Sequence, residues 1–164
     1  MLNRKTRPDT MIDFFLNEGP LRPADAAAAL IVVGENEHYL MQLRDQKPDI
    51  FYPGHWGLFG GAMEHGETPV VTLRRELKEE LLLTVDEILY FTEFVFDFGC
   101  NGFSRCIRQF FEVRVPESAL SDLVLGEGIM MRTFAAHELL TGPRVVPFDA
   151  FAVWMHATRK KVSA

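Results

Sequence analysis

Three glutamates, Glu76, Glu79 and Glu80, crowd into the stretch "RRELKEE". In a helix they would share one sector, where like charges repel by about 0.2–0.5 kcal/mol per pair. A hard divalent cation reverses this repulsion, because Mg²⁺ binds through a few carboxylates and keeps waters and substrate phosphates as further ligands. The spacing therefore indicates a metal site. The alternative is a solvated acidic face stabilised by pairs such as Arg75–Glu79.

A helix that carries these glutamates is predicted over about 69–82. Thr68 can cap its first turn, and Pro69 suits the first position because its missing N–H would be unpaired there anyway. At 100° per residue one narrow apolar stripe forms, made of Val70, Leu73, Leu77 and Leu81. The glutamate sector borders this stripe, so we expect the carboxylates to be partly shielded from water.

Glycine, arginine and glutamate recur around this helix at set spacing. The residues are Gly61, Glu67, Arg75, Glu76, Leu77, Glu79 and Glu80. Their series resembles the Nudix signature: glycine, any five residues, glutamate, any seven, then Arg-Glu-apolar-any-Glu-Glu. The preceding "YPGHWGLFGG" also resembles the usual approach to that signature. The motif covers about residues 52–83, and the order of elements over roughly 23–158 agrees with the family.

The resemblance implies a role for each matching residue. The catalytic set is Glu79, Glu80, Arg75 and Glu67; the metal ligands are Gly60, Glu76, Glu79, Glu80 and Glu127. In the family such carboxylates ligate Mg²⁺ or Mn²⁺, and the residue at Gly60 offers its carbonyl. Arg75 is held by Glu67, which fixes the loop to the helix, and orients the glutamates. The general base is one carboxylate of the set or a glutamate from a distant loop.

Two residues outside the motif are weighed beside it. Glu127 in "LGEGI" is our candidate for the distant glutamate, and an exposed loop acid beside a turn glycine is the equal alternative. Arg44 ends a predicted strand and is the candidate substrate-binding residue, for a phosphate or a base. A solvated edge arginine is its alternative.

The chain departs from the family pattern at two positions. Leu82 stands where the signature has a glycine, and the left-handed helix end that glycine allows costs leucine roughly 1–2 kcal/mol. We therefore expect the helix to end differently, a few residues later near Asp86. Phe59 replaces the proline that often precedes the double glycine. Neither change removes a carboxylate.

The rest of the chain predicts one α+β domain. "AAAALIVVG" with "HYLMQLR", and "EILYFTEFVFDFG" with "SRCIRQFFEVRV", are typical of two hairpins. "HWGLFGG" predicts one short strand, "IMMRTF" another, "AAHELL" a short helix and "FDAFAVWMHATRK" the closing helix. The resemblance implies a Nudix-type α/β/α sandwich with a mixed β-sheet over 23–164. Residues 1–22 are predicted to be an N-terminal extension with a short helix.

Composition excludes several other classes. A net charge of -6 over 164 residues lacks the basic face that a nucleic acid polymer requires. The apolar run "AAAALIVV" is too short to cross a membrane, and we expect a cytoplasmic protein with two reduced thiols, Cys100 and Cys106. A bridge between them is the alternative. Phe14, Phe15 and Leu16 either cover the site or build a homodimer contact.

The function implied is that of a divalent-metal-dependent pyrophosphohydrolase. It would cleave a nucleoside diphosphate linked to a moiety X into a nucleoside monophosphate and phosphorylated X. Neither the nucleotide nor X can be read from the sequence. The alternative is a non-hydrolytic nucleotide-sensing or interaction module of the same family.

Overall fold

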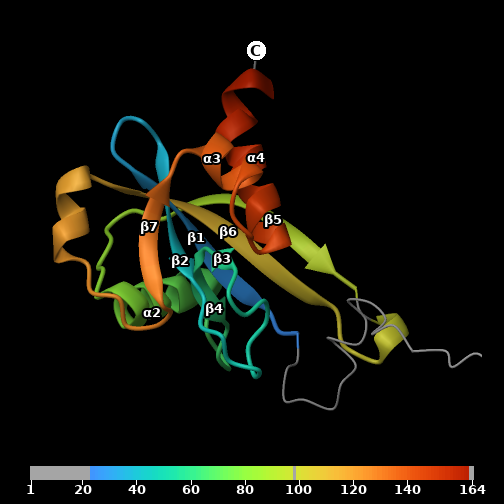
Figure 1. Ribbon diagram of the computed structural model, residues 1–164. Coiled ribbons are helices and arrows are strands. Elements are labelled where there is room, and N and C mark those ends of the chain that lie inside the picture. Colours follow the sequence, from blue (N-terminus) through green and yellow to red (C-terminus); the bar gives the residue numbers. More distant parts are fainter. Residues whose placement is uncertain (1–22, 98, 163–164) are drawn as a thin grey trace, which may run out of the picture.

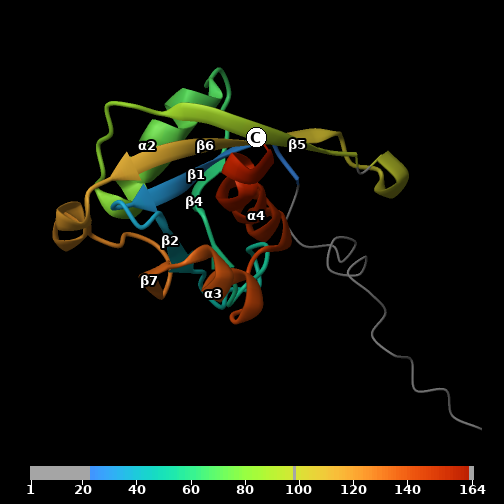
Figure 2. The ribbon, with the colours of Figure 1, turned by 90° about the horizontal axis from the view of Figure 1, so that it is seen from above.

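A seven-stranded mixed sheet lies at the centre of the computed structural model, which describes residues 23–97 and 99–162. The strands run in the order β3-β2-β1-β6-β5, with β4 added to β1 and β7 to β2. Helix α2 covers one face of this sheet, and α3 and α4 cover the other (Figures 1 and 2). The predicted α/β/α sandwich with a mixed sheet is confirmed. The predicted helix in 1–22 lies outside the described residues.

Strand β1 (Ala26–Val33) is the centre of the sheet, and each of its eight residues is buried. It pairs antiparallel with β2 (His38–Leu43) and parallel with β6 (Cys106–Val115), which forms the second predicted hairpin with β5 (Leu89–Phe96). A strand covered on both faces needs an unbroken apolar run, which "AAAALIVV" supplies. Its odd-numbered residues pack with α2, and three even-numbered residues, Ala28, Leu30 and Val32, pack with α3 and α4.

The stretch "HWGLFGG" forms two strands, and the prediction of one was wrong. β3 (Trp56–Gly57) pairs with β2, whereas β4 (Phe59–Ala62) pairs with β1. The chain changes partner at Leu58, whose N–H donates to Asp149 Oδ2 at 3.0 Å. A side chain 91 residues away therefore replaces a strand neighbour at this point. Strand β7 (Met130–Phe134) pairs with the other edge of β2.

The helices follow their predicted starts. Helix α2 (Pro69–Leu81) begins after Thr68, whose hydroxyl oxygen accepts a hydrogen bond from Val71 N. Its buried stripe consists of Leu73, Leu77 and Leu81, while Val70 is 36% exposed and lies outside the stripe. Helices α3 (Ala136–Thr141) and α4 (Pro147–Val162) close the opposite face.

Helix α2 ends at Leu82, which adopts the left-handed conformation with φ 53°. The expectation of an end near Asp86 was therefore wrong. The N–H of Leu82 donates to Lys78 O at 3.0 Å, and the N–H of Leu83 donates to Leu77 O at 3.1 Å. These two bonds satisfy the last carbonyls of the helix in the way that a glycine end does. The leucine therefore carries the backbone strain that glycine avoids.

Replacing Leu82 with glycine is expected to stabilise the protein by about 1 kcal/mol, because glycine reaches the left-handed region without a Cβ clash. Little burial is lost, since Leu82 is 64% exposed. Urea unfolding measures the change. Leu82→Ala is the matched control: it removes the side chain but keeps the Cβ, so no gain is expected. Equal gains in both variants would show that strain is not the reason.

Two further features bear on the remaining predictions. Cys100 lies in the 3₁₀ turn Gly99–Asn101, and Cys106, the first residue of β6, is a free thiol, so the alternative of a bridge between them is not realised. In the described part of the chain, no helix is both long enough and apolar enough to span a membrane.

Candidate active site

Arg75 is the centre of a hydrogen-bond network at the N-terminal half of α2. Its Nε and Nη2 donate to the two oxygens of Glu67 at 2.9 and 3.0 Å, a bidentate pair. Its Nη1 donates to Glu76 Oε1 at 2.7 Å and to Glu79 Oε2 at 3.2 Å, and Nη2 also donates to Ala62 O at 3.2 Å. One side chain thus joins β4, the loop before α2 and two of the glutamates.

Glu67 anchors the turn that leads into α2. Hydrogen bonds from Arg75, Glu64 N and the Thr72 hydroxyl lower the pKa of Glu67 to about 2. In return, the bond to Glu67 is the main cause of the raised pKa of Arg75. The Arg75–Glu67 contact implied by the resemblance is present, while its catalytic role stays a prediction.

Glu80 is buried between α2 and the sheet, with 5% of its surface exposed. Its Oε1 accepts from Gln42 Nε2 at 2.9 Å and its Oε2 from Gly60 N at 2.8 Å. Burial raises the pKa of Glu80 to about 7; the bonds from Gln42 and Gly60 oppose this, and the charges of Glu76 and Glu127 add to it. The expectation of carboxylates partly shielded beside the apolar stripe is confirmed for Glu80 and wrong for Glu79, whose side chain is 61% exposed.

Glu76 occupies space that the double glycine leaves open. A Cβ at Gly61 would lie 2.3 Å from Glu76 Oε1, so only glycine lets this carboxylate rest against β4. Burial raises the pKa of Glu76, Arg75 opposes the rise, and Glu79 and Glu127 contribute to it. Glu79 is the most accessible of the three glutamates, with 61% of its side chain exposed.

The loop that carries Glu127 lies against the C-terminal half of α2. Gly126 N donates to Glu80 O at 2.7 Å, and a Cβ at Gly126 would lie 2.4 Å from Glu79 O. The charge of Glu127 also raises the pKa of both Glu76 and Glu80. The structure therefore brings this exposed distant glutamate near the helical set. Its part in metal binding stays a prediction.

The donor set fits a hard divalent cation in its chemistry. The candidate donors are all oxygens, and the raised pKa values of Glu76 and Glu80 include mutual repulsion that a cation relieves. Glu76 and Glu79 converge on Arg75 Nη1, whereas Glu80 turns toward Gln42 and Gly60. Over 23–97 and 99–162, no three His, Cys, Asp or Glu residues are arranged to hold an ion.

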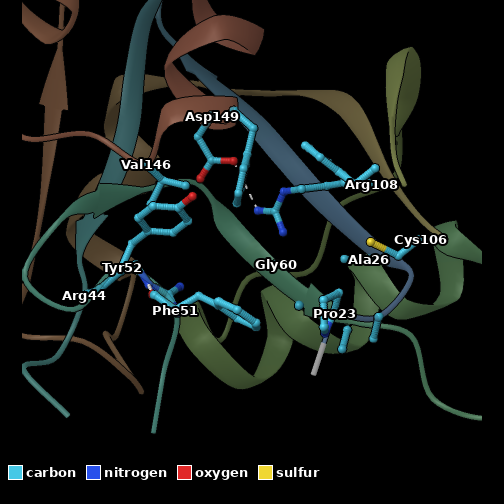
Figure 3. Close-up of a pocket in the computed structure, with 15 residues that line it drawn as sticks. Pro23, Ala26, Arg44, Phe51, Tyr52, Gly60, Cys106, Arg108, Val146 and Asp149 are labelled. Carbon is cyan, nitrogen blue, oxygen red and sulfur yellow. Dashed lines mark hydrogen bonds and ion pairs between the residues drawn. The ribbon is translucent and has the colours of Figure 1, made fainter. Parts of the chain in front are cut away.

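A cavity of about 410 Å³ adjoins β4 (Figure 3). Gly60 and Gly61 line it, so one strand separates the cavity from the glutamates of α2. Arg44 reaches the cavity from the end of β2, and its Nε donates to Phe51 O at 2.9 Å. Burial lowers the pKa of Arg44. The position of Arg44 in the cavity wall is compatible with the predicted substrate contact, which stays a prediction.

Sequence reasoning missed three polar residues of this region. Gln42, on β2, is 3% exposed and holds Glu80. Arg108, at the start of β6, and Asp149, in the first turn of α4, form an ion pair at 3.2 Å in the cavity wall. Burial raises the pKa of Asp149, and Arg108 and Arg44 oppose the rise. For Gln42 and Asp149 the available signal was a polar residue inside an otherwise apolar strand or helix start, whereas the strand of Arg108 contains other polar residues and gave no such signal.

A mixed sheet between helices, with an arginine-tied set of glutamates on the helix after a double glycine, defines the Nudix type of fold and site. The family model described as "NUDIX domain" matches residues 22–159. The chain therefore belongs to the Nudix hydrolase family.

Individual relatives agree with this placement. The chain is 44% identical over 50 residues to nucleoside triphosphatase NudI of Enterobacter sp. (strain 638), a match of 30% of this chain and 35% of that relative. Among solved structures, the MutT protein of Methanosarcina mazei Go1 is 20% identical with TM-score 0.66, covering 85% of this chain and 96% of the other.

A second solved structure is similar in fold. The Nudix domain of Shewanella oneidensis NrtR, complexed with ADP ribose, is 13% identical with TM-score 0.65, covering 92% of this chain and 99% of the other. At these identities the structures show a shared fold alone. The curated match spans about a third of the relative's length, so activity is taken up below as a proposal.

Proposed function

We propose that the protein is a divalent-metal-dependent pyrophosphohydrolase. It cleaves a nucleoside diphosphate linked to X into a nucleoside monophosphate and phosphorylated X. The observation that carries the proposal is the Arg75 network, which holds Glu67, Glu76 and Glu79 together beside a nucleoside-sized cavity. Glu67 and Glu76 are partly buried, and the desolvation of such acids is costly to a fold that does not use them.

In the proposed reaction, water attacks a phosphorus atom, one P–O bond of the anhydride breaks, and the water's proton passes to a carboxylate. That base is one glutamate of the helical set or Glu127. Glu76, Glu79, Glu80 and the Gly60 carbonyl would hold Mg²⁺ or Mn²⁺, which would supply charge stabilisation and a more acidic water. Arg75, fixed by Glu67, keeps Glu76 and Glu79 on one side of the helix.

The test combines metal binding with product analysis. Titration with Mg²⁺ or Mn²⁺ is expected to raise the melting temperature by several degrees, because a ligand that binds only the folded state stabilises it. A panel of nucleoside triphosphates, nucleotide sugars and dinucleotides is then assayed for nucleoside monophosphate. Metal binding without turnover of any compound would favour the alternative, a nucleotide-sensing module. The absence of a metal shift would contradict both the metal site and the hydrolase.

We also propose a reducing, cytoplasmic location, which the free thiol of Cys106 supports, because unbridged cysteines are typical of such compartments. The absence of a nucleic acid polymer among the partners is supported by the net charge of -6. A homodimer stays a prediction, since Phe14, Phe15 and Leu16 lie outside the described residues.

A further inference from the structure

The cavity beside β4 combines aromatic walls with one fixed ion pair. Rings of Phe51, Phe96 and Phe148 line it. Its polar side includes Arg44, Arg108 and Asp149, with the guanidinium of Arg108 pointing inward (Figure 3). Flat apolar walls with a few fixed polar groups are typical of a small-molecule site. A volume of about 410 Å³ lies at the low end of the range of such sites, which suits one nucleoside.

Arg108 is held in one orientation. Its guanidinium carbon lies 4.9 Å from the ring centre of Phe148 and 5.6 Å from that of Phe110. Its Nη2 donates to Asp149 Oδ1 at 3.2 Å, and Asp149 is itself fixed by Leu58 N at 3.0 Å. A guanidinium clamped by two rings and a buried carboxylate presents its remaining N–H groups in a fixed direction.

One nitrogen of the Arg108 guanidinium remains for a ligand. Nη2 donates to Asp149, and Nε is buried, which leaves Nη1 as the N–H donor that a molecule in the cavity can reach. An acceptor atom on a ligand would give this donor a hydrogen bond in a partly buried position. The carboxylate of Asp149, 3.2 Å from the same guanidinium, offsets one of the two cationic side chains in this wall, Arg108 and Arg44. The aromatic rings beside Arg108 therefore favour a flat ring that carries an acceptor atom.

We propose, resting on the hydrolase function above, that this cavity binds the nucleobase and that Arg108 selects bases with a carbonyl oxygen. Where guanine carries O6, adenine carries an amino group, and uracil and cytosine differ in the same way at their fourth position. An amino group at that position donates hydrogen bonds, as the guanidinium of Arg108 does, so the two groups could not bond to each other. Since Gly60 lines the cavity and also donates to Glu80, a base bound there leaves its phosphates beside α2.

The experiment measures binding of GMP and AMP to the full chain by calorimetry in EDTA, so that it requires no metal and no turnover. GMP is expected to bind at least about tenfold more tightly than AMP, the discrimination typical of a good arginine–base contact. Ribose 5-phosphate, which has no base, is expected to bind at least about tenfold more weakly than GMP. In Arg108→Lys, which keeps the charge but loses Nε and the planar fork, the preference for GMP is expected to fall below about threefold.

Arg132→Lys is the matched control, because Arg132 also stacks on a phenylalanine, 4.6 Å from the ring centre of Phe134, but does not line the cavity. It should keep the full preference. Thermal melting checks the fold of each variant. If Arg108→Lys does not fold, UMP against CMP on the unaltered chain gives a second test of the same preference.

Equal affinity for GMP and AMP, an unchanged preference in Arg108→Lys, or equal affinity for ribose 5-phosphate and GMP would each overturn the inference. The proposed function fails separately. A chain that binds GMP selectively but hydrolyses no nucleotide keeps the base site and loses the hydrolase. A chain that hydrolyses keto and amino nucleotides equally keeps the hydrolase and loses the base selection.

Discussion

Replacing Glu79 with glutamine is expected to lower kcat by about a hundredfold or more while leaving the fold almost unchanged. Glu79 is the one helical glutamate whose structural contribution is small, since 61% of its side chain is exposed and its ion pair with Arg75 is 3.2 Å long. Exposed pairs of this kind contribute about 0–1 kcal/mol. Loss of a group that binds metal or moves a proton costs about 10²–10⁴ in rate. The variant therefore separates catalysis from stability.

Activity on the best compound of the panel and metal-dependent melting are measured together. In Glu79→Gln the melting shift with Mg²⁺ or Mn²⁺ should shrink, while the melting temperature without metal stays within a few degrees. Glu87→Gln, an exposed glutamate just beyond the same helix, is the control and should retain both properties. Full turnover in Glu79→Gln would remove Glu79 from the proposed mechanism.

The two adjacent glycines are expected to respond to alanine in opposite ways. At Gly60, with φ 127°, a Cβ would lie 2.2 Å from Ala27 O in the central strand, so backbone must move and the residue is strained as well. Gly60→Ala should lose about 3 kcal/mol or more of unfolding free energy, from strain and overpacking together. At Gly61 the obstacle is the end of a flexible side chain, Glu76 Oε1 at 2.3 Å.

Gly61→Ala should therefore fold and lose activity, because the new methyl group displaces the Glu76 carboxylate and its bond to Arg75. A loss of about 10–100-fold is typical when a group that orients a metal ligand is disturbed. Urea unfolding and kcat are measured for both variants. The Gly61 prediction is contradicted if its variant unfolds as readily as Gly60→Ala, or if it retains full activity while the fold is intact.

Local signals predicted the start of α2 and its glutamate sector. Thr68 and Pro69 act through neighbours a few residues away, and the apolar stripe depends only on helical period. The end of α2 was not predicted, because strain at Leu82 is outweighed by the two bonds to Leu77 and Lys78, which no propensity describes. Tertiary context decided that position.

The cavity was beyond local reasoning. The Leu58–Asp149 bond joins residues 91 apart, and it both divides β3 from β4 and fixes the partner of Arg108. An aspartate in the first turn of a helix is already explained locally, by its favourable interaction with the helix dipole. The sequence around Asp149 therefore did not indicate its contacts with Leu58 and Arg108. The resemblance supplied the metal-ligand roles, but it was silent on Gln42, which is specific to the way β2 packs under Glu80.

The parallel pairing of β1 with β6 has a consequence for how the protein is made. Ala26 lies beside Arg108 and Val33 beside Val115. Strand β1 can therefore pair with β6 only after some eighty further residues have been synthesised. Closing so long a loop is slow, and it precedes the contacts that reward it. During synthesis helix α2 can therefore form early. The sheet face on which it packs is complete only after Val115, the last residue of β6, has left the ribosome.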